Sequence, residues 1–208
     1  MLQALRPMAP KISLRSCRAK LQLLKRFIDR IATVLFVGVS PDHGMGTESY
    51  IEKGLADHAN VTALVYPPVA KCVFGMPAVR GEARALPFAD NSFYFLVSSA
   101  VIEHIGGLSG TCKMLGECAR VGLEGWLHTT PNRRFPVELH TGMPILHWLT
   151  RPATEGAFRL TGRIFNDEQY HQFTASSLRK LGIPGKVLTT SKLVIPMTIA
   201  IASESSTK

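Results

Sequence analysis

The sequence has only four cysteines, and no two of them form a C-x-x-C pair. Zinc knuckles and small disulfide-stapled domains need closely spaced cysteines, so both classes are disfavoured, and reduced thiols in a cytoplasmic protein are expected. No apolar run approaches the ~20 residues that a membrane-spanning helix requires. The N-terminus lacks an apolar core followed by a small-residue cleavage site, so no secretory signal is predicted.

Acidic residues are scarce at one end of the chain. Residues 1–30 contain eight basic side chains and one acid, Asp29, whereas the other 178 residues contain 16 basic and 14 acidic side chains. The net charge of +9 therefore belongs mainly to one segment. It bears on the partner of that segment and is not a strong nucleic-acid signal for the body of the protein.

The basic segment has a helical pattern. Its apolar residues recur at spacings of three and four, which predicts one amphipathic helix within 1–31. The residues of this stripe are Leu14, Cys17, Leu21, Leu24, Ile28 and Ile31. Two interpretations stay open: a leading helix that packs on the domain with a solvated basic face, or a helix that contacts an anionic membrane, lipid or nucleic acid.

The remaining residues, 32–208, alternate between strand-like and helical segments and predict a single domain. Strands are expected at 33–39, 61–66, 78–81, 93–99 and 124–130, with a closing pair at 186–190 and 193–202. Helices are expected at 48–58, 108–121 and 175–181, and 131–170 is expected to form an insertion or lid. This alternation predicts an α/β fold of the Rossmann-like, doubly wound kind, with a mostly parallel seven-stranded sheet and an antiparallel C-terminal edge pair.

Two stretches in the middle of the chain carry a specific resemblance. Residues 81–93 read GEARALPFADNSF, and residues 97–105 read VSSAVIEHI. They resemble the class I S-adenosylmethionine-dependent methyltransferases, in particular the methyltransferase type 11-like group, whose pattern is G-D-A-x-x-L-P-F-x-D-x-S-F-D followed by S-x-x-V-L-E-H. The resemblance extends over Val34 to Leu181.

The resemblance implies S-adenosylmethionine as cofactor and a small-molecule, sugar or lipid-linked methyl acceptor. His104 would be the candidate general base, because a histidine changes charge near neutral pH. The cofactor-binding residues would be Gly38, Ser40, Asp42, Gly44, Glu82, Ala83, Ser98 and Ser99. The acceptor pocket would include Glu103, Asn132, Phe135, Glu138 and His140.

The sequence departs from the family pattern in the cofactor loops. The glycine-rich V-L-D-x-G-x-G-x-G is VLFVGVSPD at 34–42, and Tyr66 stands where an acid would hold the ribose hydroxyls. Residues 122–125 (GLEG) replace the usual Lys-Pro-Gly-Gly. These losses keep a second interpretation open, a non-catalytic methyltransferase-like binding module.

An RNA-directed methyltransferase is a third interpretation, favoured only by the N-terminal charge, and some methyltransferases that modify RNA ends hold a metal ion with a Glu-His pair. Glutamate and histidine side chains suit a divalent cation, and the candidates are Glu103, His104, Glu138, His140 and His147. Ala100 occupies the position where such a site would want a further carboxylate. We therefore expect no bound metal.

Overall fold

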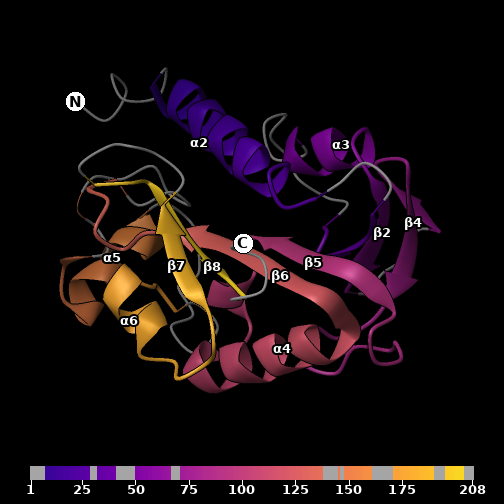
Figure 1. Ribbon diagram of the computed structural model, residues 1–208. Helices are drawn as coiled ribbons and strands as arrows, with labels where there is room; N and C mark the ends of the chain where they lie inside the picture. The colour runs from indigo at the N-terminus through magenta and orange to yellow at the C-terminus, as the bar shows by residue number, and fades with distance from the viewer. Residues whose placement is uncertain are drawn as a thin grey trace.

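The computed structural model of the chain, shown in Figure 1, describes residues 8–28, 32–40, 50–66, 71–137, 145, 148–160, 171–189 and 195–203. Its helices are α2 (Met8–Leu24), α3 (Tyr50–Ala56), the 3-10 turn η1 (Ile102–His104), α4 (Gly107–Val121), α5 (Arg151–Leu160) and α6 (Ala175–Arg179). Its strands are β1 (Thr33–Val37), β2 (Asn60–Val65), β3 (Cys72–Val73), β4 (Met76–Arg80), β5 (Phe93–Ser99), β6 (Gly122–Pro131), β7 (Lys186–Thr189) and β8 (Thr198–Ala202).

The strands form one sheet in the order β3-β4-β2-β1-β5-β6-β8-β7. Strands β4, β2, β1, β5 and β6 are parallel, and β7 and β8 form the predicted antiparallel edge pair. The doubly wound α/β prediction is confirmed, but the described residues form a sheet of eight strands and not the predicted seven. The added strand is β3, which pairs antiparallel with β4 across the Phe74–Gly75 turn, where both residues have positive φ.

The central strand β1 has the sequence TVLFV, and its last four residues are buried. A continuous apolar run is typical of a parallel strand that is covered on both faces. Strand order reverses between β1 and β5, since the chain builds outward to β4 on one side of β1 and then crosses to the other. Ligands of open α/β sheets bind at such a switch point, outside the carboxyl ends of the strands.

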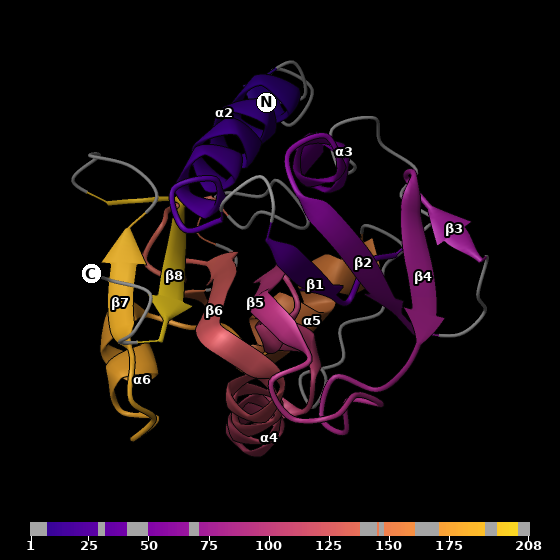
Figure 2. The same ribbon diagram turned by 45° about the vertical axis from the view of Figure 1, so that its right-hand side comes forward.

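Helices cover both faces of the sheet. Figures 1 and 2 show α2 and α3 on one face and α4 and α6 on the other. Each face has its own apolar cluster: Phe36, Phe95 and Leu127 belong to the α2 side, and Leu35, Leu96 and Trp126 belong to the α4 side. Neighbouring residues of β1, β5 and β6 thus serve opposite layers, as the two-residue period of a strand requires.

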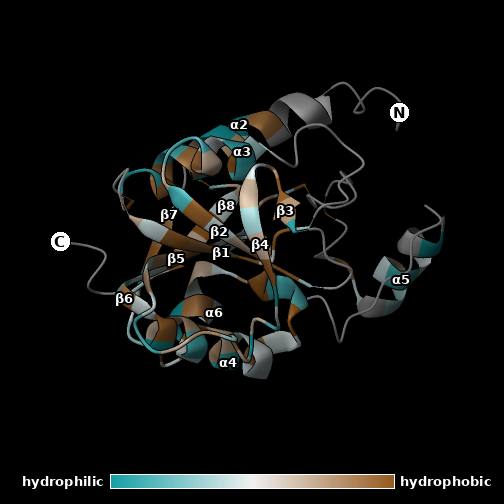
Figure 3. Ribbon diagram, turned by 90° about the vertical axis from the view of Figure 1, so that its right-hand side faces the viewer, coloured by the Kyte–Doolittle hydropathy of each residue, from teal (hydrophilic) through white to brown (hydrophobic). Residues whose placement is uncertain are grey.

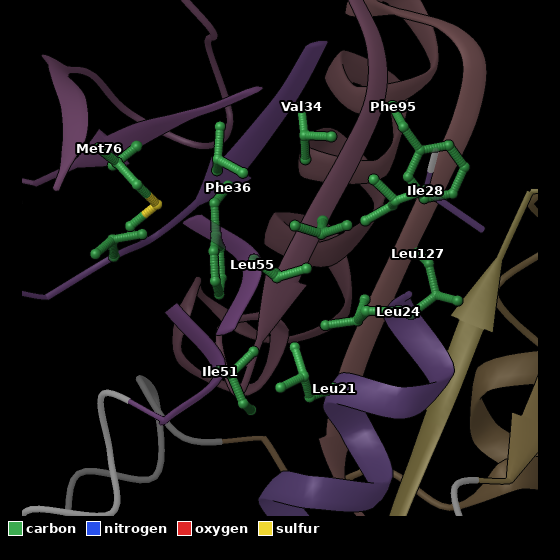
Figure 4. Packing of buried hydrophobic residues seen from close by; sticks show 14 of the residues in the cluster. Leu21, Leu24, Ile28, Val34, Phe36, Ile51, Leu55, Met76, Phe95 and Leu127 are labelled. Atoms are coloured by element: carbon green, nitrogen blue, oxygen red, sulfur yellow. The ribbon is translucent and has the colours of Figure 1, made fainter. Parts of the chain in front are cut away.

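The N-terminal helix α2 is part of the core. Leu21, Leu24 and Ile28 are buried, and Figure 4 shows them beside Leu55 of α3 and Phe95 of β5. Of the two interpretations of this segment, packing of the apolar stripe on the domain is therefore confirmed for these three residues. The helix itself ends at Leu24, so Ile28 reaches the core from the turn that follows.

The segment predicted as an insertion contains α5, which Figure 3 shows set apart from the sheet and its covering helices. The chain returns to the body at α6. There Thr174 caps the helix: its Oγ1 accepts a hydrogen bond from the Ser177 backbone N–H at 3.1 Å, and the Ser177 hydroxyl oxygen accepts one from the Thr174 N–H.

Candidate cofactor and acceptor site

The turn after β1 begins with Gly38 in a left-handed conformation, φ +78°. A Cβ at this position would lie 2.6 Å from Cγ2 of Val101, so both the backbone angle and the neighbour favour glycine. The N–H groups of Gly38 and Val39 both donate to the Leu64 carbonyl of β2, each at 3.0 Å. Ser40 is half-buried just beyond this turn, whereas the predicted Asp42 and Gly44 lie outside the described residues.

Glu82 and Ala83, two of the predicted cofactor-binding residues, lie after β4, at the same edge of the sheet. The Glu82 carboxylate accepts two hydrogen bonds from the Arg84 guanidinium, from Nε at 2.9 Å and from Nη2 at 3.0 Å. The bonded Arg84 holds the pKa of Glu82 below its usual range. Glu82 is thus an ionised acceptor, and Ala83 beside it is buried.

Tyr66 follows β2, where the family carries the ribose-binding acid. Its side chain is 71% exposed, so the phenol is open to solvent at the carboxyl edge. Arg84, the partner of Glu82, follows the neighbouring strand β4. This part of the edge therefore carries a carboxylate, a guanidinium and an aromatic ring.

The two serines that end β5 face opposite layers. Ser99 is half-buried on the α2 side, where its Oγ accepts a hydrogen bond from Nζ of Lys20 at 3.2 Å. Ser98 is fully buried on the other side, and its Oγ lies 2.8 Å from Nδ1 of His128 on β6. The Ser98 hydroxyl is thus engaged within the protein, and its assignment to the cofactor stays a prediction.

The chain turns sharply after β5. Ala100 has φ +57°, a conformation that costs a non-glycine residue about 1–2 kcal/mol. The turn leads into η1, where Glu103 is 1% exposed and accepts a hydrogen bond from Thr130 Oγ1 at 3.0 Å. His104 is exposed on the same turn. The structure therefore separates the pair: Glu103 is bonded to β6, and His104 is accessible to a substrate.

Asn132 and Phe135 begin the insertion after β6. The Asn132 side chain donates to the Pro196 carbonyl at 2.8 Å and accepts from the Arg134 N–H at 3.1 Å, so it holds the local turn. Phe135 is half-buried. Their place in an acceptor pocket stays a prediction, and the predicted Glu138 and His140 lie outside the described residues.

Much of the recognised 81–93 motif has a structural role. Arg120 of α4 donates to the carbonyls of Leu86 and Phe88, at 3.1 and 2.8 Å, and pairs with Asp90 at 2.8 Å. Phe88 and Phe93 pack edge to face with ring centroids 4.9 Å apart. These contacts hold the second half of the motif against α4, and Glu82 stands before this half, directly after β4.

Metal ligation has no support from the described residues. Among them, no group of three or more histidine, cysteine, aspartate or glutamate side chains is placed to hold a metal ion. Glu138, His140 and His147 are not described, so the five-residue site considered above is not tested.

Four partners of the predicted site residues were not predicted from the sequence. Lys20 and Thr129 lie beside Ser99 on the α2 side of the sheet, Arg84 pairs with Glu82, and His128 contacts Ser98. Lys20 lies 79 positions before its partner Ser99. Thr129 is the register partner of Ser99 on β6. Neither relationship has a local sequence signal, because one depends on helix docking and the other on strand pairing.

Comparison with known proteins places this geometry in a fold class. No protein-family model matches the chain, and no curated protein matches it. Among solved structures, a Thermotoga maritima S-adenosylmethionine-dependent methyltransferase, described as a possible histamine N-methyltransferase, aligns with TM-score 0.58 at 16% identity, covering 92% of this chain and 90% of its own. A Methanosarcina mazei S-adenosylmethionine-dependent methyltransferase aligns with TM-score 0.51 at 14% identity, covering 86% and 95%.

The chain has the fold of the class I S-adenosylmethionine-dependent methyltransferases. A structure from Rhodobacter sphaeroides with a name that refers to zinc-dependent alcohol dehydrogenases also aligns, with TM-score 0.53 at 14% identity, over 84% of both chains. Similarity at this level shows the fold and leaves the chemistry to the residues of the site. None of the described helices is both long and apolar enough to cross a membrane.

Proposed function

We propose that the protein is an S-adenosylmethionine-dependent methyltransferase that acts on a small-molecule, sugar or lipid-linked acceptor. One juxtaposition supports this best. The left-handed Gly38 turn after β1 and the ionised Glu82 after β4 lie at one edge of a sheet with the class I fold. A glycine turn permits close approach of a ligand to the backbone, and a carboxylate can accept from an adenine amino group.

These residues fit the cofactor in part. Gly38 and Ser40 would contact the amino-acid portion, Glu82 and Ala83 the adenine ring, and Ser99 the carboxylate and methyl-donor end. The missing ribose acid is the main misfit, and the exposed Tyr66 takes its position. The absence of a charge-assisted hydrogen bond reduces affinity by about ten- to a hundred-fold, so we expect a weaker cofactor site than the family pattern would predict.

When bound, S-adenosylmethionine supplies a methyl group already activated on a sulfonium. The protein then has to hold the acceptor in line and exclude water, and positioning provides most of the acceleration. His104 is exposed at the end of η1 and is the proposed base for an acceptor that must lose a proton. Its role is tested by His104→Gln, which should lower turnover of such an acceptor and leave cofactor affinity unchanged.

We further propose that the acceptor is anionic or carries an anionic carrier group. Arg15, Arg18, Lys25 and Arg26 of the N-terminal helix region are exposed. On the same segment as Lys20, whose ammonium reaches the carboxyl end of β5, they form a basic surface. A phosphate or an anionic lipid headgroup would be attracted to it, and salt would screen the attraction.

The test of the enzyme proposal is binding followed by turnover. S-adenosylhomocysteine at a hundred times its dissociation constant should stabilise the protein by about 2.7 kcal/mol, seen as a higher melting temperature. Glu82→Ala should reduce this stabilisation, and the matched change Glu124→Ala, near the amino end of β6, should leave it unchanged. No stabilisation at millimolar ligand would contradict the proposal.

A binding module without catalysis is the second candidate, and Tyr66 is the observation that favours it. An aromatic ring in place of the ribose acid leaves no carboxylate for the two hydroxyls at that position. The two candidates differ in one result: both bind S-adenosylhomocysteine or a related nucleoside, but only the enzyme transfers a labelled methyl group to an acceptor pool.

A further inference from the structure

An ammonium group from the N-terminal helix lies at the carboxyl end of β5. Lys20 of α2 donates from Nζ to Oγ of Ser99 at 3.2 Å, and Ser99 is the last residue of that strand. Lys20 is half-buried and has no carboxylate partner among the described residues. A partly desolvated ammonium without a counter-charge favours the binding of an anion.

The position of Lys20 is fixed by contacts on both sides of it. One turn earlier, the Ser16 hydroxyl is hydrogen-bonded to the Thr198 hydroxyl of β8 at 2.9 Å, in a buried contact. Leu21 and Leu24, which follow, are buried in the core. Residues four apart lie on one helix face, so Ser16 and Lys20 both meet the sheet edge. The ammonium is therefore held in place before any ligand arrives.

A second polar group lies beneath it. Thr129 of β6 is the register partner of Ser99 and is fully buried, and its Oγ1 has no hydrogen-bond partner within the described structure. Paired residues of adjacent strands place their side chains on the same face. Lys20, Ser99 and Thr129 thus bring an ammonium and two hydroxyls to one place, a donor set that suits the two oxygens of a carboxylate.

We propose that Lys20, with Ser99 and Thr129, binds the carboxylate of the cofactor's amino-acid moiety. The inference rests on the proposed function. It assigns a cofactor contact to α2, a helix that comes before all the strands of the sheet in the sequence. Glu82 follows β4, and β2 and β1 separate β4 from β5, so the two ends of the site are three strand spacings apart, or about 14 Å. An adenosine joined to an amino-acid side chain extends along such an edge, with the adenine at Glu82 and the carboxylate at Lys20.

The test compares a ligand that has the amino-acid moiety, with its carboxylate, and a ligand that lacks this moiety. S-adenosylhomocysteine carries the amino-acid moiety, and 5′-methylthioadenosine lacks it. The affinities are measured by calorimetry on the full chain. Lys20→Met should lower the affinity for S-adenosylhomocysteine by about ten- to a hundred-fold and leave the affinity for 5′-methylthioadenosine unchanged. Lys20→Arg should recover part of this affinity, and Lys25→Met, an exposed lysine in the turn that follows α2, should change neither affinity.

The outcomes separate this inference from the proposed function. If Lys20→Met binds S-adenosylhomocysteine as tightly as the wild type does, the carboxylate contact is wrong and the proposed function stands. Equal weakening of both ligands would show that Lys20 only supports the fold, and the ligand-free melting temperature of Lys20→Met would report the same defect. If the wild type binds neither ligand, the proposed function fails and this contact fails with it.

Discussion

Nδ1 of His128 lies 2.8 Å from Oγ of Ser98, and both side chains are fully buried between β5, β6 and the α4 layer. Trp126 stacks on the imidazole with ring centroids 5.3 Å apart. Nε2 of His128 has no hydrogen-bond partner within the described residues. Burial lowers the pKa of His128 to about 3, so the ring is neutral in the folded protein at all ordinary pH values.

The first prediction is an acid-sensitive stability that depends on His128. In the unfolded chain its pKa returns to about 6.5, so between pH 6.5 and 3 the unfolded state binds one more proton. The contribution of His128 to the free energy of unfolding should be constant above pH 6.5 and fall by about 1.4 kcal/mol per pH unit between pH 6.5 and 3. His128→Gln should remove this part of the slope in denaturant titrations, whereas exposed His104→Gln should keep it. Equal slopes for wild type and His128→Gln would contradict the buried neutral ring.

The second prediction concerns the docking of α2. Leu24 is fully buried in the core cluster shared with α3 and the sheet, so Leu24→Ala should lower the free energy of unfolding by about 2–5 kcal/mol. Gln22→Ala, exposed on the same helix, should change it by less than about 0.5 kcal/mol. Denaturant unfolding of both variants is the measurement. A Leu24→Ala protein as stable as the Gln22→Ala protein would mean that α2 is a detached tail.

The third prediction separates backbone strain from crowding at the first turn. Gly38 and Gly75 both have positive φ, +78° and +82°, but only a Cβ on Gly38 would meet a neighbour, Val101. Gly75→Ala should destabilise by about 1–2 kcal/mol through its backbone alone. Gly38→Ala should add an overpacking cost of about 1–3 kcal/mol. In the double variant Gly38→Ala/Val101→Ala, the smaller side chain at 101 should remove this overpacking cost. If the free-energy losses of the two single variants simply add in the double variant, the contact between position 38 and Val101 is absent.

The fourth prediction concerns the basic surface. Reversing Arg18, Lys25 and Arg26 to Glu should leave the melting temperature nearly unchanged, because all three are exposed. It should weaken binding to anionic vesicles by about 1 kcal/mol for each basic side chain that no longer faces the membrane surface.

The control carries the same change in charge on the opposite layer, Lys113, Arg179 and Lys180 to Glu, on α4 and at the end of α6. Vesicle binding measured by co-sedimentation should survive in this control. Equal binding by wild type and both variants would leave the α2 surface without a role in recognition.

The fold was predictable wherever a local pattern determines it. The apolar run of β1 and the Thr174 cap of α6 carry their signals within a few residues. The eighth strand was missed because β3 has two residues and depends on positive φ at Phe74, which a bulky residue rarely adopts.

The site was predictable only in outline. The motif identified Ser98 and Ser99 together, but in a strand they face opposite layers, and only Ser99 lies on the side of Lys20. The partners of both serines, Lys20 and His128, are distant in sequence, so no local pattern could assign them.

The central claim is that a nucleoside cofactor lies along the carboxyl edge of β4, β2, β1 and β5. A crystal structure of the protein grown with S-adenosylhomocysteine tests it most directly. We predict difference density for the ligand along this edge. Its adenine amino group should lie at the Glu82 carboxylate, its homocysteine portion should pass the Gly38 turn, and its carboxylate should lie within hydrogen-bond distance of Nζ of Lys20. Density for the ligand at another surface, or none at this edge at saturating concentration, would contradict the account.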